Sequence, residues 1–350
     1  MISDPITPTY RFVPYGTRFE ARENTLVLDV GMKTVPGIID HHHPDAEPEC
    51  TASLIIKHPQ LVMNHIDRER IVKENDHSHI LQIITHYRPD FDAVSSIFLT
   101  LKLLDAGKID PVMEKIASYT KMVDSASLPK EWDLPSTPYA ILRSLFLKIR
   151  KINNEAYLER VKKGLSFMSF LYDRSKEGHE IFQNKSLFAG IDKYEKAINT
   201  AEDDYFDYLR DLERSQTLSL NLPLISGKGK KTVDGIIVRN PHSYLFKDWA
   251  RRDATHSPLK QGFSFLMTNF GNTRFILGVD PEIGIHLKGL GDLLNQKEEE
   301  QRKREDRPFT QRWYDGNCPL FNFRIIDSPQ DISSLSHQEI VETVMNFSQS

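Results

Sequence analysis

The sequence predicts an α/β protein with a mostly parallel sheet in its first part, a helical connector, and a smaller C-terminal α/β region. Strand-like apolar runs alternate with helical patterns up to residue 107, helical patterns then follow one another, and strand-like runs return after residue 226. Strands that alternate with helices imply a largely parallel sheet covered on both faces. We therefore predict three regions, at 1–135, 136–225 and 226–350.

The first region holds three predicted strands. "NTLVLDVG" (24–31) and "GIIDHH" (37–42) are apolar runs that lead into acidic residues, and "CTASLIIKHP" (50–59) follows as a helix. Residues 78–107 predict a third strand, a polar loop and an amphipathic helix closed by Gly107. Because ligands of such sheets bind beyond the carboxyl ends of the strands, polar residues at these ends are candidate site residues.

The later regions are predicted from their patterns alone. Helix follows helix from about residue 136 to 218, and "SGKGKK" (226–231) predicts a turn or loop. Strand-like runs then stand at 233–240, 262–270 and 274–280. The charge run "NQKEEEQRKREDR" (295–307) predicts a solvated helix face or a mobile loop.

The composition limits the class of protein. The 350 residues are 39% hydrophobic and 27% charged, with a formal net charge of −4. This mildly acidic balance argues against a dedicated duplex-DNA binder. Cys50 and Cys318 form no ligand-spaced cluster, and we expect reduced thiols in a cytoplasmic protein. No apolar run is long enough to span a bilayer, and we expect no membrane association.

Acidic residues and histidines gather at the predicted strand ends. They are Asp29, Asp40, His41, His42, His86, Asp90 and Asp92, with Asp124 from a later helical segment. Four or more carboxylates at one sheet edge repel one another unless cations neutralise them. Mixed His and Asp ligands suit Mn²⁺ or another borderline divalent ion. Two such ions can activate water and stabilise the charge on a phosphoryl group.

These motifs resemble those of the DHH phosphoesterase superfamily, which includes RecJ-type exonucleases, oligoribonucleases and type II pyrophosphatases. The namesake motif stands as Asp40-His41-His42, and a second motif stands as "HYRPDFDAVSS" (86–96). Asp29 in "LVLDVG" and Asp124 in "KMVDSAS" match the remaining aspartates. The resemblance covers about the first 130 residues and implies a Rossmann-like sheet. The motif order departs from the family's, because Asp29 and Asp40-His41-His42 precede His86.

The resemblance implies a role for each residue. His86 and Asp90 would bind one metal, and His41, Asp92 and Asp124 the other, with Asp29 as the bridge. Asp40 would sit behind His41 and orient it. His42 would face the substrate phosphate as a donor or general acid, whereas His43 is expected at the surface or behind the ligands. Asp105, Asp110 and Asp133 compete with Asp124 for the last position. Two Mn²⁺ ions are favoured, with Mg²⁺ or Co²⁺ as alternatives.

The last region contributes a candidate substrate-binding stretch, "VRNPHSYLFKDWARRD" (238–253). It predicts a loop at Asn240-Pro241 followed by a helix that carries basic residues. The candidates for a phosphate- or base-binding patch are Arg239, Asn240, His242, Ser243, Lys247 and Arg251. The alternative is that these are ordinary solvated charges.

The sequence therefore predicts a two-metal hydrolase that cleaves phosphodiester bonds of a small nucleotide or a short single-stranded oligonucleotide. A pyrophosphatase or polyphosphatase acting on phosphoanhydride bonds is one alternative. A non-catalytic nucleotide-binding sensor is the other. The sequence leaves open whether the chain forms a homodimer.

Overall fold

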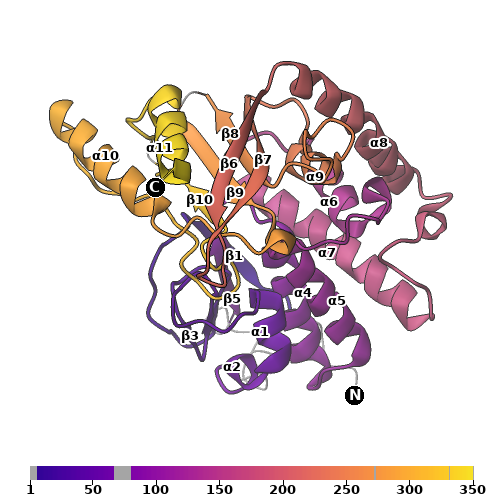
Figure 1. Ribbon diagram of the computed structural model, residues 1–350. Helices are drawn as coiled ribbons and strands as arrows, with labels where there is room; N and C mark the ends of the chain where they lie inside the picture. Colours follow the sequence, from indigo (N-terminus) through magenta and orange to yellow (C-terminus); the bar gives the residue numbers. More distant parts are fainter. Residues whose placement is uncertain (1–5, 67–79, 272, 331, 350) are drawn as a thin grey trace. The chain divides into compact units, whose positions relative to one another are not determined.

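The computed structural model describes residues 6–66, 80–271, 273–330 and 332–349, and it is a mixed α/β structure with two five-stranded sheets (Figure 1). The general α/β class predicted from the sequence is confirmed. The chain divides into two compact units at residue 200, apart from two short exchanged segments at 129–131 and 318–320. None of the described helices is long and apolar enough to cross a membrane.

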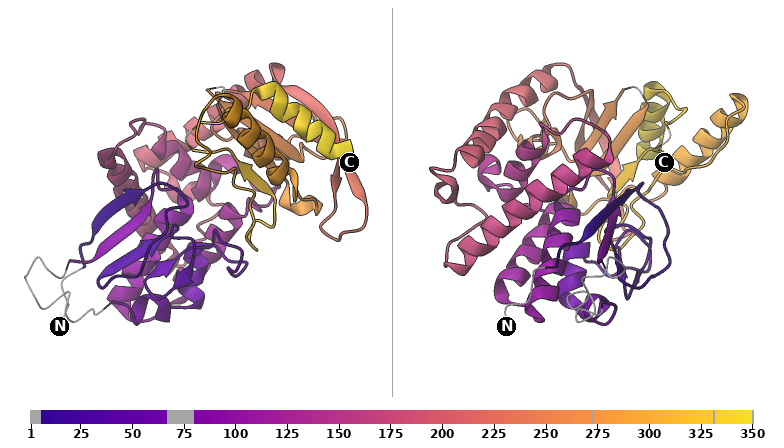
Figure 2. Two further views of the ribbon diagram at one scale, coloured as in Figure 1. Left: turned by 90° about the vertical axis from the view of Figure 1, so that its left-hand side faces the viewer. Right: turned by 180° about the vertical axis from the view of Figure 1, so that it is seen from behind.

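The first sheet has the order β1-β5-β2-β4-β3 and is parallel except at one edge. Its strands, side by side in the left view of Figure 2, are β1 (Thr9–Val13), β2 (Thr25–Leu28), β3 (Thr34–Val35), β4 (Ile38–Ile39) and β5 (Gln82–His86). β2 pairs in parallel with both β4 and β5, and β3 pairs antiparallel with β4. The carboxyl ends of β2, β4 and β5 therefore lie at one edge.

Two of the predicted strands are shorter than expected. β2 ends at Leu28 because Asp29 takes a left-handed backbone conformation, with φ of 60°. β4 has only two residues because it closes a tight hairpin with β3, whose turn uses Gly37 at φ 85°. The edge strand β1 was not predicted. Residues 78 and 79 of the third predicted strand lie outside the described residues.

Helices pack against the first sheet and against one another. α4 (Phe91–Ala106) contacts β2 and β5, and α1 (Thr51–Lys57), α5 (Pro111–Asp124) and α7 (Asn154–Lys176) pack on α4. Asp90 caps the start of α4 by accepting from the Ala93 N–H, and Gly107 ends the helix in a left-handed conformation, as predicted. The other helical segments of this part are α2 (Gln60–Met63), η2 (Leu134–Ser136), α6 (Pro138–Phe146) and η3 (Lys185–Phe188).

A loop contributes to the covering of this sheet. Val27 and Ile84 are cross-strand neighbours, and they pack with Val13, Ile38 and the half-buried Phe19 of the β1–β2 loop. Residues alternate between the two faces of a sheet, so Leu26 and Ile83 belong to the opposite face. Loop residues as well as helices therefore shield the strands from solvent.

The second unit is built on a mixed sheet of order β10-β9-β8-β7-β6. Its elements are β6 (Gln216–Pro223), β7 (Lys230–Arg239), α9 (Phe246–Arg252), β8 (Phe265–Phe270), β9 (Arg274–Val279), η4 (Pro281–Ile283), α10 (Leu290–Arg304), β10 (Ile325–Asp327) and α11 (His337–Gln349). The structure divides the chain within α8 (Asp192–Glu213) rather than at the predicted residue 226. The reason is β6, which pairs with β7 although it lies in the stretch predicted as helical.

Residues 295–304 of the charge run lie in α10, but the prediction of a solvated face is wrong for two of its charged residues. Glu298 and Arg302 of α10 are fully buried, and the Arg302 Nε donates to Glu298 Oε1 at 2.8 Å. Glu298 also accepts from the Trp313 indole N–H, the Ser333 hydroxyl and the Ser334 N–H. Distant partners thus replace the water that the charges would otherwise need.

This network predicts that Glu298→Ala destabilises the protein by about 3–5 kcal/mol, because it strands the buried Arg302 charge. The measurement is urea unfolding. Glu299→Ala is the matched control one position away, since the Glu299 side chain is half exposed and pairs with Lys303 at the surface; we expect a loss below about 1 kcal/mol. Equal losses in the two variants would contradict the burial of the network.

Candidate metal centre

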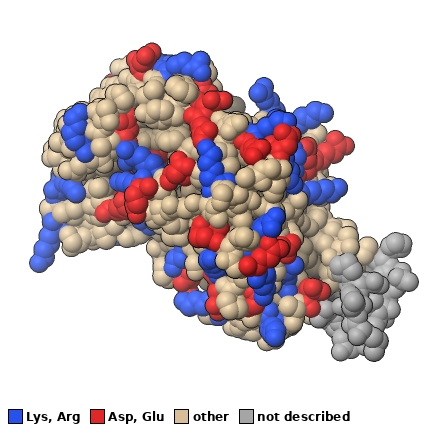
Figure 3. Space-filling model, turned by 90° about the vertical axis from the view of Figure 1, so that its right-hand side faces the viewer, with Lys and Arg blue, Asp and Glu red and all other residues tan. Residues whose placement is uncertain are grey.

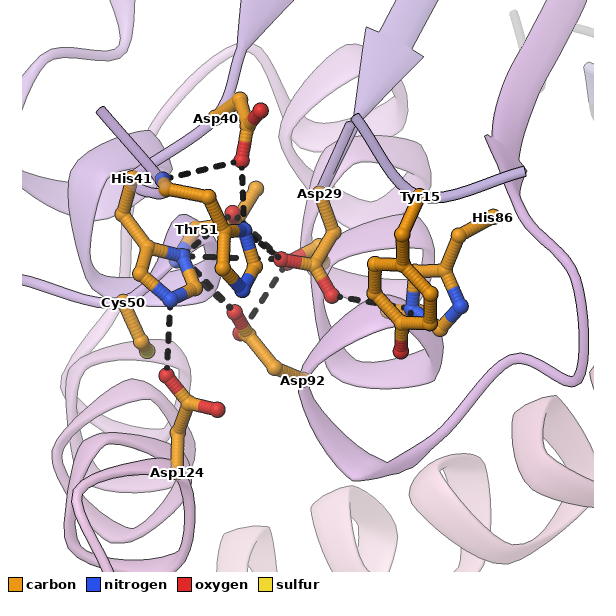
Figure 4. A network of polar contacts seen from close by, with 12 residues as sticks. Tyr15, Asp29, Asp40, His41, Cys50, Thr51, His86, Asp92 and Asp124 are labelled. Atoms are coloured by element: carbon orange, nitrogen blue, oxygen red, sulfur yellow. Dashed lines mark hydrogen bonds and ion pairs between the residues drawn. The ribbon is translucent and has the colours of Figure 1, made fainter. Parts of the chain in front are cut away.

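The predicted ligands converge at the carboxyl edge of the first sheet. Asp29 follows β2, Asp40 to His42 follow β4, and His86 ends β5. The start of α4 supplies Asp90 and Asp92, and the last residue of α5 supplies Asp124. Figure 4 shows Asp29 between His41 and His86, with Asp124 on the side of His41. All six predicted metal ligands are therefore brought together.

One group consists of Asp29, His86 and Asp90. The His86 Nε2 lies 3.2 Å from Asp29 Oδ2 and 3.7 Å from Asp90 Oδ1. His86 and Asp29 are buried, whereas the Asp90 side chain is half exposed. One ligand atom from each of the three residues lies within 4.8 Å of the others, so a single ion can reach all three.

The second group consists of His41, Asp92 and Asp124, whose ligand atoms satisfy the same condition. The His41 Nε2 lies 3.1 Å from Asp124 Oδ2, and its Nδ1 lies 3.7 Å from Asp92 Oδ2. Asp92 accepts from the backbone N–H groups of Thr51 and Ala52, each at 2.9 Å, and so anchors the start of α1. This anchoring holds the carboxylate in place without neutralising it.

Asp29 connects the two groups. Its Oδ2 faces His86, and its Oδ1 lies 3.5 Å from His41 Nδ1. The Thr51 hydroxyl donates to the same Oδ1 at 3.0 Å. The two carboxylate oxygens thus point in different directions, which is the arrangement that a bridging ligand needs.

Hydrogen bonds select the tautomer of both buried imidazoles. The His86 Nδ1 lies 2.8 Å from the Tyr87 carbonyl oxygen and must donate to it. The His41 Nδ1 lies 3.2 Å from the Thr51 hydroxyl, which already donates to Asp29 and therefore accepts here. In the neutral rings each Nε2 then carries a lone pair, and it faces carboxylate oxygens. Such orientation by carbonyls and hydroxyls is typical of metal-ligating histidines.

The electrostatics of the site favour a bound cation. In the described part of the chain, the ion pairs of Asp29, Asp92 and Asp124 are all with histidines. Burial and the charges of Asp29 and Asp124 raise the pKa of Asp92 well above its usual range. Burial would lower the pKa of His86, but Asp90 and Asp29 outweigh it and raise that pKa to about 10. A divalent ion among these side chains would neutralise the carboxylate charges that cause both pKa shifts. The residues present therefore fit a divalent metal site.

Asp40 contacts His42 directly. Its Oδ1 accepts from the His42 N–H at 3.1 Å and lies 2.7 Å from the His42 Nδ1, whereas the predicted role of Asp40 in orienting His41 stays a prediction. An aspartate side chain readily bonds the backbone two residues later, and this local turn directs it toward the third residue of the motif. Thr51, which was not predicted, contacts the His41 Nδ1.

His42 is the partly exposed histidine of the motif, with 18% of its side chain accessible. Burial opposes its charged form, but Asp40, Asp29 and Asp124 raise the pKa of His42 well above its ordinary value. Burial also opposes ionisation of Asp40, yet His42, His41 and the Met32 N–H hold the pKa of Asp40 well below its usual range. The pair therefore presents a cationic donor held by a buried carboxylate.

Tyr15 is a further residue of the site that the sequence did not indicate. Its ring stacks on His86 with 4.1 Å between centroids, and its hydroxyl lies 3.2 Å from His86 Nε2. The hydroxyl also donates to Asp90 Oδ2 at 3.3 Å. Tyr15 follows the unpredicted strand β1, so no motif or strand pattern pointed to it.

The competing aspartates lie elsewhere. Asp110 caps the opposite end of α5 by accepting from the Val112 and Met113 N–H groups. Asp133 accepts from the Ser136 hydroxyl, and Asp105 is exposed near the end of α4. His43 is half-buried, with its Nε2 3.3 Å from the Thr34 hydroxyl.

The candidate substrate-binding residues lie in the second unit, where three of them serve the fold. Ser243 is buried and donates to Asp204, and the Asn240 Oδ1 accepts from the Gly271 N–H. Arg251 donates to the Val279 carbonyl, whereas Arg239 and His242 have exposed side chains. Lys247 is half-buried in α9, which forms the predicted helix. A substrate patch at these residues stays a prediction.

No model of a known protein family matches the chain, and no curated protein sequence matches it.

Thr51→Val is predicted to weaken divalent-metal binding by about 10–100-fold, because it removes the hydroxyl that orients His41 and Asp29. The measurement is calorimetric titration of chelator-treated protein with Mn²⁺. Ser53→Ala is the control from the same helix, since that hydroxyl donates to the Cys50 carbonyl and is not among the contacts of His41 or Asp29 given above. Unchanged affinity in Thr51→Val would argue against the assigned orientation of His41.

The metal-free protein is predicted to lose stability between about pH 7 and pH 10. His86 has a pKa raised from 6.5 to about 10, so its contribution is fully present below pH 6.5 and is lost as the pH rises through about 10. The measurement is the free energy of unfolding in chelator across this range, with His86→Gln as the comparison. A flat wild-type profile would rule out a protonated His86 in the metal-free fold.

Proposed function

We propose that this chain is a divalent-metal-dependent phosphoesterase of the DHH phosphoesterase type, on a Rossmann-like first unit. The observation that carries the proposal is the position of Asp29, whose two oxygens face two separate His and Asp groups. The parallel neighbours β5, β2 and β4 support the finer fold assignment, because they bring the permuted motifs to one sheet edge. Position in space, not order along the chain, decides whether such a site is complete.

In this proposal His86, Asp90 and Asp29 hold one ion, and His41, Asp92, Asp124 and Asp29 hold the other. Mn²⁺ is favoured over Mg²⁺ or Co²⁺ because the set mixes imidazole and carboxylate ligands. When bound, the two ions activate water and neutralise the charge that develops on a phosphoryl group. Cys50 and Cys318 are free cysteines, which supports a location in the cytoplasm, where thiols stay reduced.

The residues of the chain supply binding and proton transfer. His42 donates a hydrogen bond from its partly exposed ring to a phosphate oxygen, or a proton to the leaving oxygen. Asp40 holds the His42 ring through Nδ1 and so orients it. Thr51 and the Tyr87 carbonyl keep the two buried imidazoles in the orientation that ligands need.

A small nucleotide or short single-stranded oligonucleotide is the proposed substrate. A long strand needs a continuous basic track along its backbone. On the face drawn in Figure 3, Lys and Arg lie interspersed with Asp and Glu instead. This supports a compact substrate, with the phosphoanhydride bond of pyrophosphate or short polyphosphate as the alternative that a substrate panel separates.

The test is hydrolysis of short RNA and DNA oligomers, cyclic dinucleotides, pyrophosphate and bis-p-nitrophenyl phosphate, with Mn²⁺, with Mg²⁺ and with chelator. We expect metal-dependent cleavage that falls at least about 100-fold in Asp124→Asn, since that residue contributes a ligand without capping a helix. Asp105→Asn is the matched control at an exposed position.

The panel also decides between the candidate functions. Cleavage of pyrophosphate alone replaces the phosphodiesterase assignment with a phosphoanhydride hydrolase. Nucleotide binding with metal but no cleavage of any member would instead indicate a sensor.

A further inference from the structure

Three arginines come from different elements beside the His86–Asp90 half of the site. Arg88 lies in the loop between His86 and Asp90, Arg143 lies on α6, and Arg160 lies on α7. Arg88 and Arg143 are exposed and Arg160 is half-buried. Arg88 stands within the motif at 86–96 but is not one of the proposed metal ligands, and Arg143 and Arg160 lie outside the motifs.

Aromatic contacts bring the three elements together. Tyr87, next to Arg88, stacks on Tyr157 of α7 with 5.3 Å between ring centroids. Phe91, at the other end of the same loop, packs edge-on against Tyr139 of α6 at 6.5 Å. Both ends of the loop are thus fixed, one on α7 and one on α6.

The guanidinium groups rest on aromatic rings. The Arg160 guanidinium lies 4.9 Å from the centroid of Phe146, and Arg143 donates to the Tyr139 hydroxyl at 3.2 Å. A ring contact of this kind holds one face of the Arg160 guanidinium and orders the side chain. The cluster is therefore partly ordered before any ligand arrives.

The charges of the cluster repel one another. Burial and the charges of Arg88 and Arg143 lower the pKa of Arg160, and Asp90 opposes them. Among the described residues, no carboxylate lies within ion-pair distance of Arg88 or Arg160. One turn further along α7, by contrast, Lys163 pairs with Glu159 at 2.8 Å. Ordinary solvated charges are spread apart or paired in this way, so a cluster of like charges favours an anionic ligand.

We infer that Arg88, Arg143 and Arg160 bind a phosphate group of the substrate other than the one that is cleaved. Guanidinium groups match phosphate oxygens in charge and in the geometry of paired N–H donors. The inference rests on the proposed function for its reaction, and it narrows the substrate to compounds with at least two phosphates. By binding this second phosphate near Asp90, the arginines would fix the position of the reacting phosphate in the site.

The first test measures binding without the reaction. Calorimetry in chelator with adenosine 3′,5′-bisphosphate is expected to show affinity at least about tenfold weaker in Arg88→Gln and in Arg160→Gln. Arg150→Gln, an exposed arginine near the start of α7, is the matched control and should bind as the wild type does. Arg160→Lys keeps the charge but not the paired donors, and should restore only part of the affinity.

The second test measures the reaction with Mn²⁺. Arg160→Gln should raise KM for a 5′-phosphorylated dinucleotide at least about tenfold and leave bis-p-nitrophenyl phosphate, which has a single phosphate, unchanged. Equal losses on both substrates would overturn the inference, as would an equal loss of binding in Arg150→Gln. If no substrate is hydrolysed, the proposed function fails while the chelator experiment still decides whether the cluster binds phosphate.

Discussion

The candidate site depends on one buried contact, in which the Asp92 carboxylate of α4 accepts from the first two N–H groups of α1. This contact fixes α1, and α1 in turn places the Thr51 hydroxyl between His41 and Asp29. The same carboxylate lies among the charges of Asp29 and Asp124. The group that organises the helices therefore also lies among the candidate metal ligands, so a cation bound there would be coupled to folding through it.

The two units treat buried carboxylates in opposite ways. Glu298 in the second unit is surrounded by donors that include the guanidinium of Arg302, so its charge is neutralised within the fold. In the described part of the first unit, the ion pairs of Asp29, Asp92 and Asp124 are all with histidines, which carry a positive charge only when protonated. Buried carboxylates with a full set of partners stabilise a fold, whereas buried carboxylates that lack cationic partners are typical of ligand-binding sites.

The sequence predicted the α/β class and the convergence of six ligands, because parallel strands with acidic ends gather those ends at one edge. It did not predict the partner of Asp40, which depends on a local turn at His42. It missed β6 although Leu218, Leu220 and Leu222 alternate with polar residues, since helical patterns were predicted up to about residue 218 and strands only after residue 226. The burial of Glu298 could not be foreseen either, because Trp313 and Ser333 join it from distant positions.

The short connection between β2 and β4 affects how the site assembles. Asp29 and the Asp40-His41-His42 motif are separated by about ten residues, which include the β3–β4 hairpin, so bringing them together loses little chain entropy. His86 and Asp124 join only when much longer stretches of chain have closed. In a nascent chain, Asp29 and the Asp40-His41-His42 motif can therefore meet before β5 has been synthesised, as a local seed to which His86, Asp90, Asp92 and Asp124 are added later.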